Sequence, residues 1–154
     1  SPAAFAIAGE MVARGASPWR IAAAVYEAEP LARYALLGRA LTTLELSCGG
    51  KLATLYVNGE MYRATGSSKE MTDQFVNYAR SIRGVEVAII FRELPDGRFK
   101  ASMRSGGTID VSAVGVRFNG GGHKNAAGAE LPGPIERARA PLAAAFAGVL
   151  GCAS

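Results

Sequence analysis

Hydrophobic and polar positions repeat with a helical period in the first third of the chain and with an alternating period over much of the remainder. Residues 31–46 carry apolar side chains three and four positions apart, which predicts a helix with one apolar side. Ser17-Pro18 is typical of an N-cap followed by proline at the first helical position, so a turn near residues 14–16 separates two earlier helices. The pattern therefore predicts three helices before residue 47.

Alternating segments become frequent after residue 47, and a hairpin is the clearest of them. Two alternating runs, 85–94 and 98–104, flank the turn sequence Pro95-Asp96-Gly97. We also expect a strand over residues 51–58, turned by Asn58-Gly59. Helices are predicted over residues 71–80, 111–118 and 134–150. The predicted fold class is α/β, a mixed β-sheet flanked by helices and preceded by an α-helical connector.

Three consecutive glycines stand directly before the only histidine, in Gly120-Gly121-Gly122-His123-Lys124. Each glycine costs roughly 1 kcal/mol in chain freedom relative to alanine. Such a run suits a turn whose bare N–H groups bind an anion, and Lys124 adds positive charge there. A plain turn with a packed or surface histidine is the alternative. A dinucleotide-binding fingerprint is excluded because the glycines follow a predicted helix instead of a strand.

The second hairpin strand has one face that is either solvated or a strip that binds phosphate. This face carries Arg98, Lys100, Ser102 and Arg104. Arg104 leads into a small-residue turn, where a guanidinium beside exposed amides suits phosphate. We predict that Arg104 and Ser105 bind a ligand, that Lys100 and Ser102 are further candidates, and that Arg98 is solvated.

Other polar residues have structural or open roles. Asp110 directly precedes a predicted helix and is interpreted as its N-cap. Asp73 and Asn77 lie four residues apart on another predicted helix, where they could bond to each other, to the connector or to a ligand. Asn77 is therefore a further candidate for ligand binding.

Composition narrows the class of protein. With 154 residues, 49% of them hydrophobic, the chain can bury one core. A net charge of +4 fits an anionic ligand but not a general nucleic-acid coating. No apolar run approaches the ~20 residues that span a bilayer, so we expect no membrane association. The chain begins without methionine or a signal-peptide pattern, so we interpret it as a fragment. Cys48 and Cys152 lie far apart without metal-type spacing, so we expect no disulfide and a reducing cytoplasm.

The glycine segment resembles a known module. Gly120-Gly121-Gly122-His123 followed by Ala126-Ala127-Gly128 is similar to the signature of the DHH-associated domain. This domain is the C-terminal substrate-binding module of DHH-family phosphoesterases in the RecJ-like superfamily. Upstream segments resemble its oligoribonuclease/pAp-phosphatase branch, namely residues 73–78, 82–88, 100–105 and 110–111. The resemblance covers roughly residues 47–131. Asn119 replaces a further glycine of this branch, and because asparagine tolerates left-handed geometry we expect the same loop shape.

The resemblance implies a division of the chain and a set of ligands. Residues 1–46 would be the helical end of the catalytic DHH domain plus the connector, and residues 47–154 the DHH-associated domain. Substrate phosphate and sugar would be held by Arg104, Ser105, Gly120, Gly121, Gly122, His123 and Lys124. The implied partners are short single-stranded RNA or DNA oligonucleotides or nucleotides and the catalytic domain of the same protein, with a homodimer as a further option.

The catalytic groups of this family are expected outside the chain. Its Asp-His-His motif and further aspartates hold paired divalent metals, manganese or magnesium, and the sequence has neither a His-His pair nor an aspartate cluster. The parent enzyme would hydrolyse short RNA oligonucleotides and dephosphorylate 3′-phosphoadenosine 5′-phosphate. Open alternatives are the substrate domain of a cyclic-dinucleotide phosphodiesterase, a tRNA-binding domain related to that of alanyl-tRNA synthetase, and a structural lid or oligomerisation element.

We therefore expect this chain by itself to bind substrate without cleaving it, because a two-metal site needs several converging carboxylate and imidazole ligands. Incubating the purified chain with a labelled pentanucleotide and manganese should leave the substrate intact. Metal-dependent release of mononucleotides that a point change within the chain abolishes would overturn this expectation.

Overall fold

The first 31 residues form a helical unit of their own in the computed structural model, which describes residues 1–152. It contains α1 (Pro2–Ala13) and α2 (Pro18–Tyr26). The predicted N-cap of α2 is confirmed, since the Ser17 hydroxyl accepts a hydrogen bond from the N–H of Arg20 at 3.4 Å. Neither helix buries a residue.

The second unit, Ala32–Ser154, is built on a six-stranded mixed sheet with the order β1-β2-β3-β4-β6-β5. Among the described strands, only the pair β2–β3 is parallel. The strands are β1 (Glu45–Ser47), β2 (Leu52–Val57), β3 (Val87–Glu93), β4 (Phe99–Ser105), β5 (Gly121–His123) and β6 (Ala126–Leu131). The helices are α3 (Leu31–Leu41), α4 (Gly59–Thr65), α5 (Phe75–Arg80), α6 (Val111–Arg117) and α7 (Ile135–Leu150), with 3-10 turns η1 (Cys48–Gly50) and η2 (Lys69–Thr72). The predicted α/β class is confirmed, as are helices preceding the sheet.

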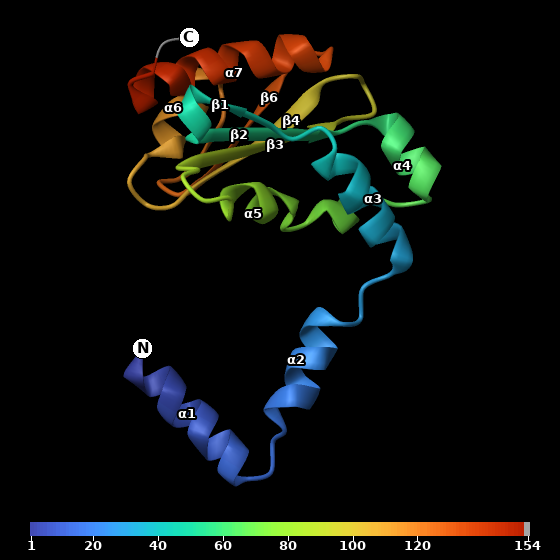
Figure 1. Cartoon of the computed structure of the whole chain (residues 1–154), viewed down its shortest axis with the longest axis vertical. Helices are drawn as coiled ribbons and strands as arrows, with labels where there is room; N and C mark the ends of the chain where they lie inside the picture. The colour runs from blue at the N-terminus through green and yellow to red at the C-terminus, as the bar shows by residue number, and fades with distance from the viewer. Residues whose placement is uncertain (153–154) are drawn as a thin grey trace. The chain divides into compact units, whose positions relative to one another are not determined.

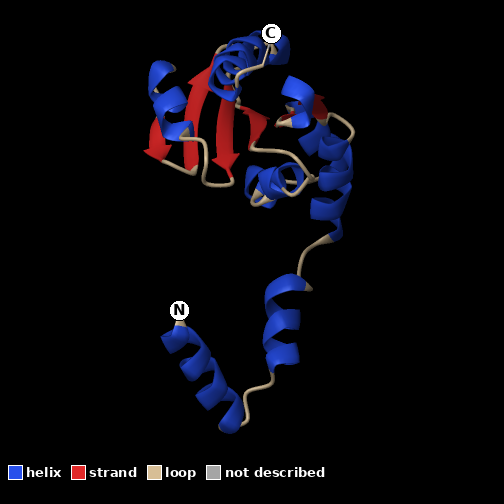
Figure 2. Ribbon diagram, turned by 60° about the vertical axis from the view of Figure 1, so that its left-hand side comes forward, coloured by secondary structure: helices blue, strands red, loops and turns tan. Residues whose placement is uncertain are grey.

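Helices lie on both sides of the sheet, with α7 on one side and α5 on the other (Figures 1 and 2). The larger buried cluster joins α6 and α7 to strand residues such as Ile89, Phe91 and Met103. The second cluster joins α3 and α5 to Leu55, Ile90 and other residues of β2 and β3. Among the described residues, this second cluster takes none from β4, β5 or β6. On the side opposite α6 and α7, α5 contacts β4, and the polar outer residues of β4, β5 and β6 join no hydrophobic cluster among the described residues.

The predicted hairpin is confirmed. β3 and β4 pair antiparallel, and the turn is closed by hydrogen bonds from Leu94 to Arg98 at 2.7 Å and from Gly97 to Leu94 at 2.9 Å. Gly97 has a φ of 80°, which suits the Asp-Gly turn chemistry. The alternation separates the faces as expected, because Phe99, Ala101 and Met103 are all buried in the larger cluster.

The predicted helix over residues 31–46 is too long. α3 ends at Leu41, and residues 45–47 form β1, which pairs antiparallel with β2. The hydroxyls of Thr42 and Thr43 donate to the carbonyls of Arg39 and Ala40, both at 2.7 Å, which ends the helix locally. The same Thr43 hydroxyl accepts from the N–H of Tyr56 at 2.9 Å and so ties the end of α3 to the sheet.

Two further local predictions need correction. Asn58-Gly59 does not turn the strand back, because Asn58 caps α4 by accepting from the N–H of Met61 at 3.0 Å. The helix predicted over residues 71–80 is divided into η2 and α5. Gln74 has a φ of 68° at the break, and Arg33 of α3 donates to the carbonyls of Met71 and Asp73, which directly precede it.

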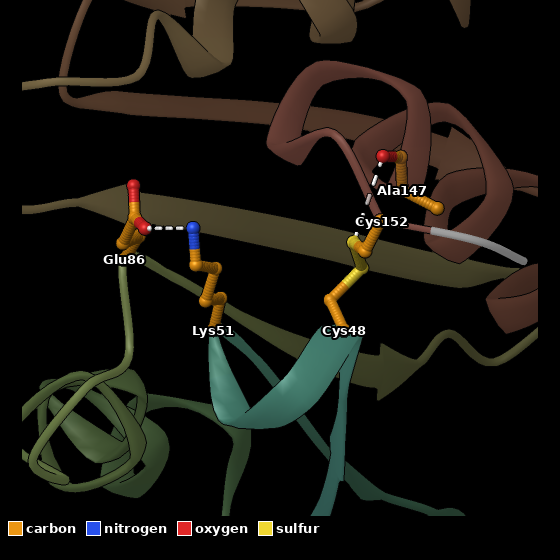
Figure 3. Close-up of a disulfide and its surroundings, with 5 residues drawn as sticks. All are labelled: Cys48, Lys51, Glu86, Ala147 and Cys152. Atoms are coloured by element: carbon orange, nitrogen blue, oxygen red, sulfur yellow. Dashed lines mark hydrogen bonds and ion pairs between the residues drawn. A yellow bond between two sulfur atoms is a disulfide. The ribbon is translucent and has the colours of Figure 1, made fainter.

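The expectation that the cysteines are unpaired is wrong. Cys48 and Cys152 form a disulfide with their Cα atoms 5.3 Å apart, although 104 residues separate them in the sequence (Figure 3). α7 runs back over the sheet and brings its end beside η1, an arrangement that sequence spacing does not reveal. The pairing removes the argument for a reducing cytoplasm that rested on unpaired cysteines.

Within residues 1–152, no helix combines the length and the apolar character needed to cross a membrane.

Candidate functional site

The glycine run forms an edge strand and not the predicted turn. β5 pairs with β6 in the register Gly121 with Gly128 and His123 with Ala126. The turn lies after the glycines, at Lys124 and Asn125. The N–H of Gly120, expected to be free for an anion, donates to the carbonyl of Gly115 in α6 at 2.9 Å.

Close backbone packing explains two of the three glycines. A Cβ at Gly120 would lie 2.0 Å from the carbonyl oxygen of Gly128, and one at Gly122 would lie 2.4 Å from that of Ala126. Gly122 also has a φ of 150°, whereas a Cβ at Gly121 would meet nothing within 4 Å. Asn119 adopts a φ of 56°, so the left-handed geometry expected for it is confirmed.

The uncovered face of β4 and β6, here called the open face, carries the residues that alternate with the buried ones. These are Lys100, Ser102 and Arg104 of β4 and Ala126, Gly128 and Glu130 of β6. A groove of about 730 Å³ covers part of this face, from Lys100 and Ser102 to Ala126, Gly128 and the edge residues 118–121, and neither Arg104 nor His123 is among its lining residues. We call it the strand groove.

Arg104, Ala126 and His123 lie in one row across β4, β6 and β5. Ala126 is the register partner of both, and directly paired residues point to the same face of a sheet. Two strand spacings separate the Cα atoms of Arg104 and His123 by about 10 Å. His123 is exposed, and Arg104 is half-buried with one guanidinium N–H donated to the carbonyl of Met103 at 3.0 Å. The small side chain of Ala126 leaves space between them for a ligand.

Glycines form the floor in the next row. Ser102 pairs with Gly128, and Gly128 with Gly121. A flat floor that exposes the main chain permits close approach of a ligand. Ser102 is itself buried, and its hydroxyl accepts a hydrogen bond from Arg92. Its predicted role in direct contact with a ligand therefore competes with this internal bond.

Arg92 is the functional candidate that the sequence analysis missed. It lies in β3 opposite Lys100, and its guanidinium donates to Ser102 and, at 3.3 Å, to the hydroxyl of Thr72. The available signal was a cation at the end of the apolar run 87–91, at a position whose alternation assigns it to the same face as Ile90. Arg92 and Lys100 both line the strand groove, as does the ion-paired Arg98.

Arg98 has carboxylate partners and is solvated as expected. Its side chain is 52% exposed and pairs with Asp96 at 2.7 Å and Glu130 at 2.6 Å. The hydrogen bond from Arg98 lowers the pKa of Asp96. The positive charge of Arg98 is therefore balanced by two carboxylates. Lys100 forms no ion pair within residues 1–152, so it is the better candidate for binding an anionic ligand.

Ser105 and Lys124 lie at the end of the sheet where α6 begins. The Ser105 hydroxyl donates to the carbonyl of Ile109 at 2.7 Å, and its side chain is buried on the face opposite Arg104. The carbonyl of Lys124 accepts from the N–H of Val111 at 2.9 Å, while its side chain is exposed. Both residues thus fasten the start of α6 to the sheet.

Three further polar residues that the sequence singled out do not belong to the open face. They are Asp110, Asn77 and Asp73. Asp110 caps α6 as predicted, accepting from the N–H of Ser112 at 2.9 Å and of Ala113 at 3.2 Å, and its hydrogen bond with the Ser112 hydroxyl lowers its pKa. Asn77 donates to the side chain of Gln74 at 2.8 Å and does not line the strand groove. Asp73 lies outside α5, so the two residues do not share a helical face.

Residues 1–152 contain no group of three or more His, Cys, Asp or Glu side chains that could hold a metal ion. The residues present do not fit a two-metal centre, and no reaction step through a metal is assigned to them.

Comparison with known proteins agrees with this architecture. Residues 49–147 match the model of the DHHA1 domain. Over 104 residues the chain is 32% identical to the bifunctional oligoribonuclease and PAP phosphatase NrnA of Thermus thermophilus, a match that covers 68% of this chain and 30% of that protein.

Two solved structures share the fold. An exopolyphosphatase-related protein from Bacteroides fragilis superposes with a TM-score of 0.83 and 26% identity, covering 98% of this chain and 43% of that one. A pGpG-specific phosphodiesterase, PggH from Vibrio cholerae, gives a TM-score of 0.50 at 10% identity, covering 78% of this chain and 39% of that one, and supports the fold alone. The chain thus spans about a third of its curated relative and under half of these solved chains. By the match over residues 49–147, the chain belongs to the DHHA1 domain family.

Proposed function

We propose that this chain is the substrate-binding part of a DHH-family phosphoesterase and binds short single-stranded oligonucleotides or nucleotides on its open face. The relative from Thermus thermophilus is named an oligoribonuclease and PAP phosphatase, and both substrates implied by that name carry phosphate and a nucleoside. The metal-dependent hydrolysis, with manganese or magnesium, belongs in this proposal to a catalytic half outside the chain.

The observation that carries the proposal is the row of Arg104, Ala126 and His123. An arginine and a histidine flank a small residue on an uncovered sheet face, beside a floor that contains Gly121 and Gly128. A guanidinium donates in pairs to phosphate oxygens, and an imidazole can donate to phosphate or stack on a base. In this proposal Arg104 and His123 hold the substrate phosphate, while Lys124 adds charge from the adjacent turn.

Residues 1–46 are proposed to belong with the catalytic half and the connector. α1 and α2 bury none of their side chains, and Phe5, Trp19 and Tyr26 are 81%, 72% and 74% exposed. Exposed apolar side chains of this kind indicate a surface that another part of a protein covers. The matched structure from Bacteroides fragilis extends over 98% of this chain, so it includes a counterpart for most of these residues.

Substitution of Arg104 by alanine should weaken ligand binding by about 1.5–3 kcal/mol, or roughly ten- to hundredfold in Kd, because a charge-assisted hydrogen bond is lost. Calorimetric titration of the chain with 5′-phosphorylated diadenylate, compared with a long duplex, measures both affinity and preference. The wild type should prefer the short ligand, since the cationic surface is too small to track a duplex. His123→Ala should also weaken binding with unchanged melting, because the side chain is exposed.

Arg83→Ala is the matched control, since it removes the same charge from an exposed position that belongs to none of the strands β4, β5 and β6 of the open face. It should leave the Kd for the short ligand unchanged. Tighter binding of the duplex would reject the proposal in favour of general nucleic-acid binding. Absence of binding to any nucleotide would favour the lid or oligomerisation alternative.

A further inference from the structure

Ser102 carries the only hydroxyl among the open-face residues of β4 and β6. The residue is 8% exposed and lines the strand groove. Its register partner in β6 is Gly128, which has no side chain to cover the hydroxyl from that side. Ser102 lies two residues from Arg104, about 7 Å along the strand, a distance that one nucleotide spans.

The hydrogen bond from Arg92 determines what the Ser102 hydroxyl has left to offer. Arg92 and Ser102 are diagonal neighbours on one face of the β3–β4 pair, and the guanidinium donates to the serine oxygen. A guanidinium has no acceptor, whereas a hydroxyl has one hydrogen to donate besides its lone pairs. Within residues 1–152 the hydroxyl makes no other hydrogen bond. Its own hydrogen is therefore available to an acceptor in the groove.

A second anchor fixes the guanidinium of Arg92. Another of its nitrogens donates to the hydroxyl of Thr72 at 3.3 Å. Thr72 is 2% exposed and gives its own hydrogen to the carbonyl of Lys69 at 2.6 Å, so its oxygen is the acceptor for Arg92. Arg33 of α3 in turn holds the carbonyls on either side of Thr72. Because the guanidinium is a planar fork, these two hydroxyls on different elements set its orientation.

The charge around Ser102 favours an anionic acceptor. Arg92 lies directly opposite Lys100, and neither cation forms an ion pair within residues 1–152. Like charges that face each other across two strands repel, and an anion beside them lowers the repulsion. A hydroxyl that accepts a hydrogen bond from a cation is polarised and becomes a stronger donor. A phosphate oxygen suits this position better than a second donor group.

We propose that Arg92 is a positioning residue of the ligand site, which orients the Ser102 hydroxyl so that it donates to a phosphate oxygen of the nucleotide bound in the row of Arg104 and His123. Arg92 acts through Ser102 and does not contact the ligand itself. This inference rests on the proposed function, because that row supplies the ligand.

The test is a double-mutant cycle measured by calorimetric titration of the purified chain with 5′-phosphorylated diadenylate. Ser102→Ala should weaken binding about tenfold, since one hydrogen bond to a charged group is lost. Arg92→Lys keeps the charge, but an ammonium does not reproduce the fork that bonds both hydroxyls, so we expect a similar loss. In the Ser102→Ala background, Arg92→Lys should cause no further weakening. A purely structural role, or direct contact of Arg92 with the ligand, would instead weaken binding in both backgrounds.

Thr43→Val is the matched control for the loss of a partly buried hydroxyl. The Thr43 hydroxyl bonds to the carbonyl of Ala40 and the N–H of Tyr56, outside the strands of the open face. This variant should melt at a lower temperature than the wild type and keep the wild-type Kd.

Equal effects of Arg92→Lys in the two backgrounds would overturn the proposal, as would wild-type affinity of Ser102→Ala. If either result accompanies weakened binding by Arg104→Ala, the proposed function stays intact. Should Arg92→Lys fail to fold, Thr72→Val removes the second anchor of the guanidinium and replaces it in the cycle, with the same expectation. Failure of the wild type to bind the dinucleotide would overturn both the proposed function and this inference.

Discussion

Alanine in place of Gly122 is expected to destabilise the chain by about 2–6 kcal/mol and to abolish ligand binding, because overpacking costs about 1–3 kcal/mol and backbone strain adds about 1–3 kcal/mol. The new Cβ would lie 2.4 Å from the carbonyl oxygen of Ala126 and 2.6 Å from the Cα of Ala127, and both are backbone atoms that cannot turn away. The strain arises from the φ of 150° at this position. Either β5 separates from β6 or the register shifts, and both outcomes move His123 away from Arg104. Urea denaturation, together with hydrogen exchange of the β6 amides, measures the loss.

Gly121→Ala is the matched control in the neighbouring position. Its Cβ would meet nothing within 4 Å and its φ is not in the left-handed range, so we expect stability close to that of the wild type. If Gly121→Ala and Gly122→Ala both have the same free energy of unfolding as the wild type, the close packing of β5 on β6 is wrong.

Reduction of the disulfide is the second change with a large expected effect. Opening the bond between Cys48 and Cys152 should lower the free energy of unfolding by about 2–5 kcal/mol. The bridge closes a long segment, with a sequence separation of 104 between its ends, and therefore restricts the unfolded chain strongly. In the native state it fastens the end of α7 to η1, beside the ion pair of Lys51 and Glu86 at 3.1 Å (Figure 3). Denaturation with and without dithiothreitol measures the difference.

The double variant Cys48→Ser, Cys152→Ser separates the bridge from other effects of the reductant. It should show the lower stability without reductant and no further change when reductant is added. Mass spectrometry of the oxidised wild type should find no free thiol. Two alkylatable thiols under oxidising conditions, with equal stability in both buffers, would contradict the pairing.

Elements with local signals were predicted well from the sequence. Ser17 and Asp110 cap helices because a short polar side chain can reach amides only two or three residues ahead. The hairpin around Asp96-Gly97 results from turn chemistry between two alternating strands. The left-handed backbone of Asn119 reflects the tolerance of asparagine for that geometry.

Boundaries were less predictable where tertiary contacts compete with helical propensity. Glu45 and Leu46 fall within the predicted helix but form β1 with Ser47, because pairing with β2 satisfies their backbone groups. The break at Gln74 is held by Arg33, which donates to the carbonyls of Met71 and Asp73 from a distant part of the sequence. Neither contact is encoded in a window of neighbouring residues.

The candidate site divides in the same way. Alternation assigns Lys100, Ser102 and Arg104 to one strand face, and the resemblance to the DHH-associated domain pointed to Gly120–His123, so the family and the β4 side of the open face could be predicted from the amino-acid sequence. The folded chain was needed to show that His123 shares a row with Arg104, that Arg92 joins the same face, and that Gly120 and Gly122 are required by backbone contact with β6. It also revealed the pairing of Cys48 with Cys152. The row needs the pairing of β4 with β6 and the disulfide needs the return of α7, and both are contacts between residues far apart in the chain. The contacts of Gly120 and Gly122 with β6, and of Arg92 with Ser102, join strands that are close in sequence but depend on the register of their pairing, whereas caps, turns and alternation need no partner strand.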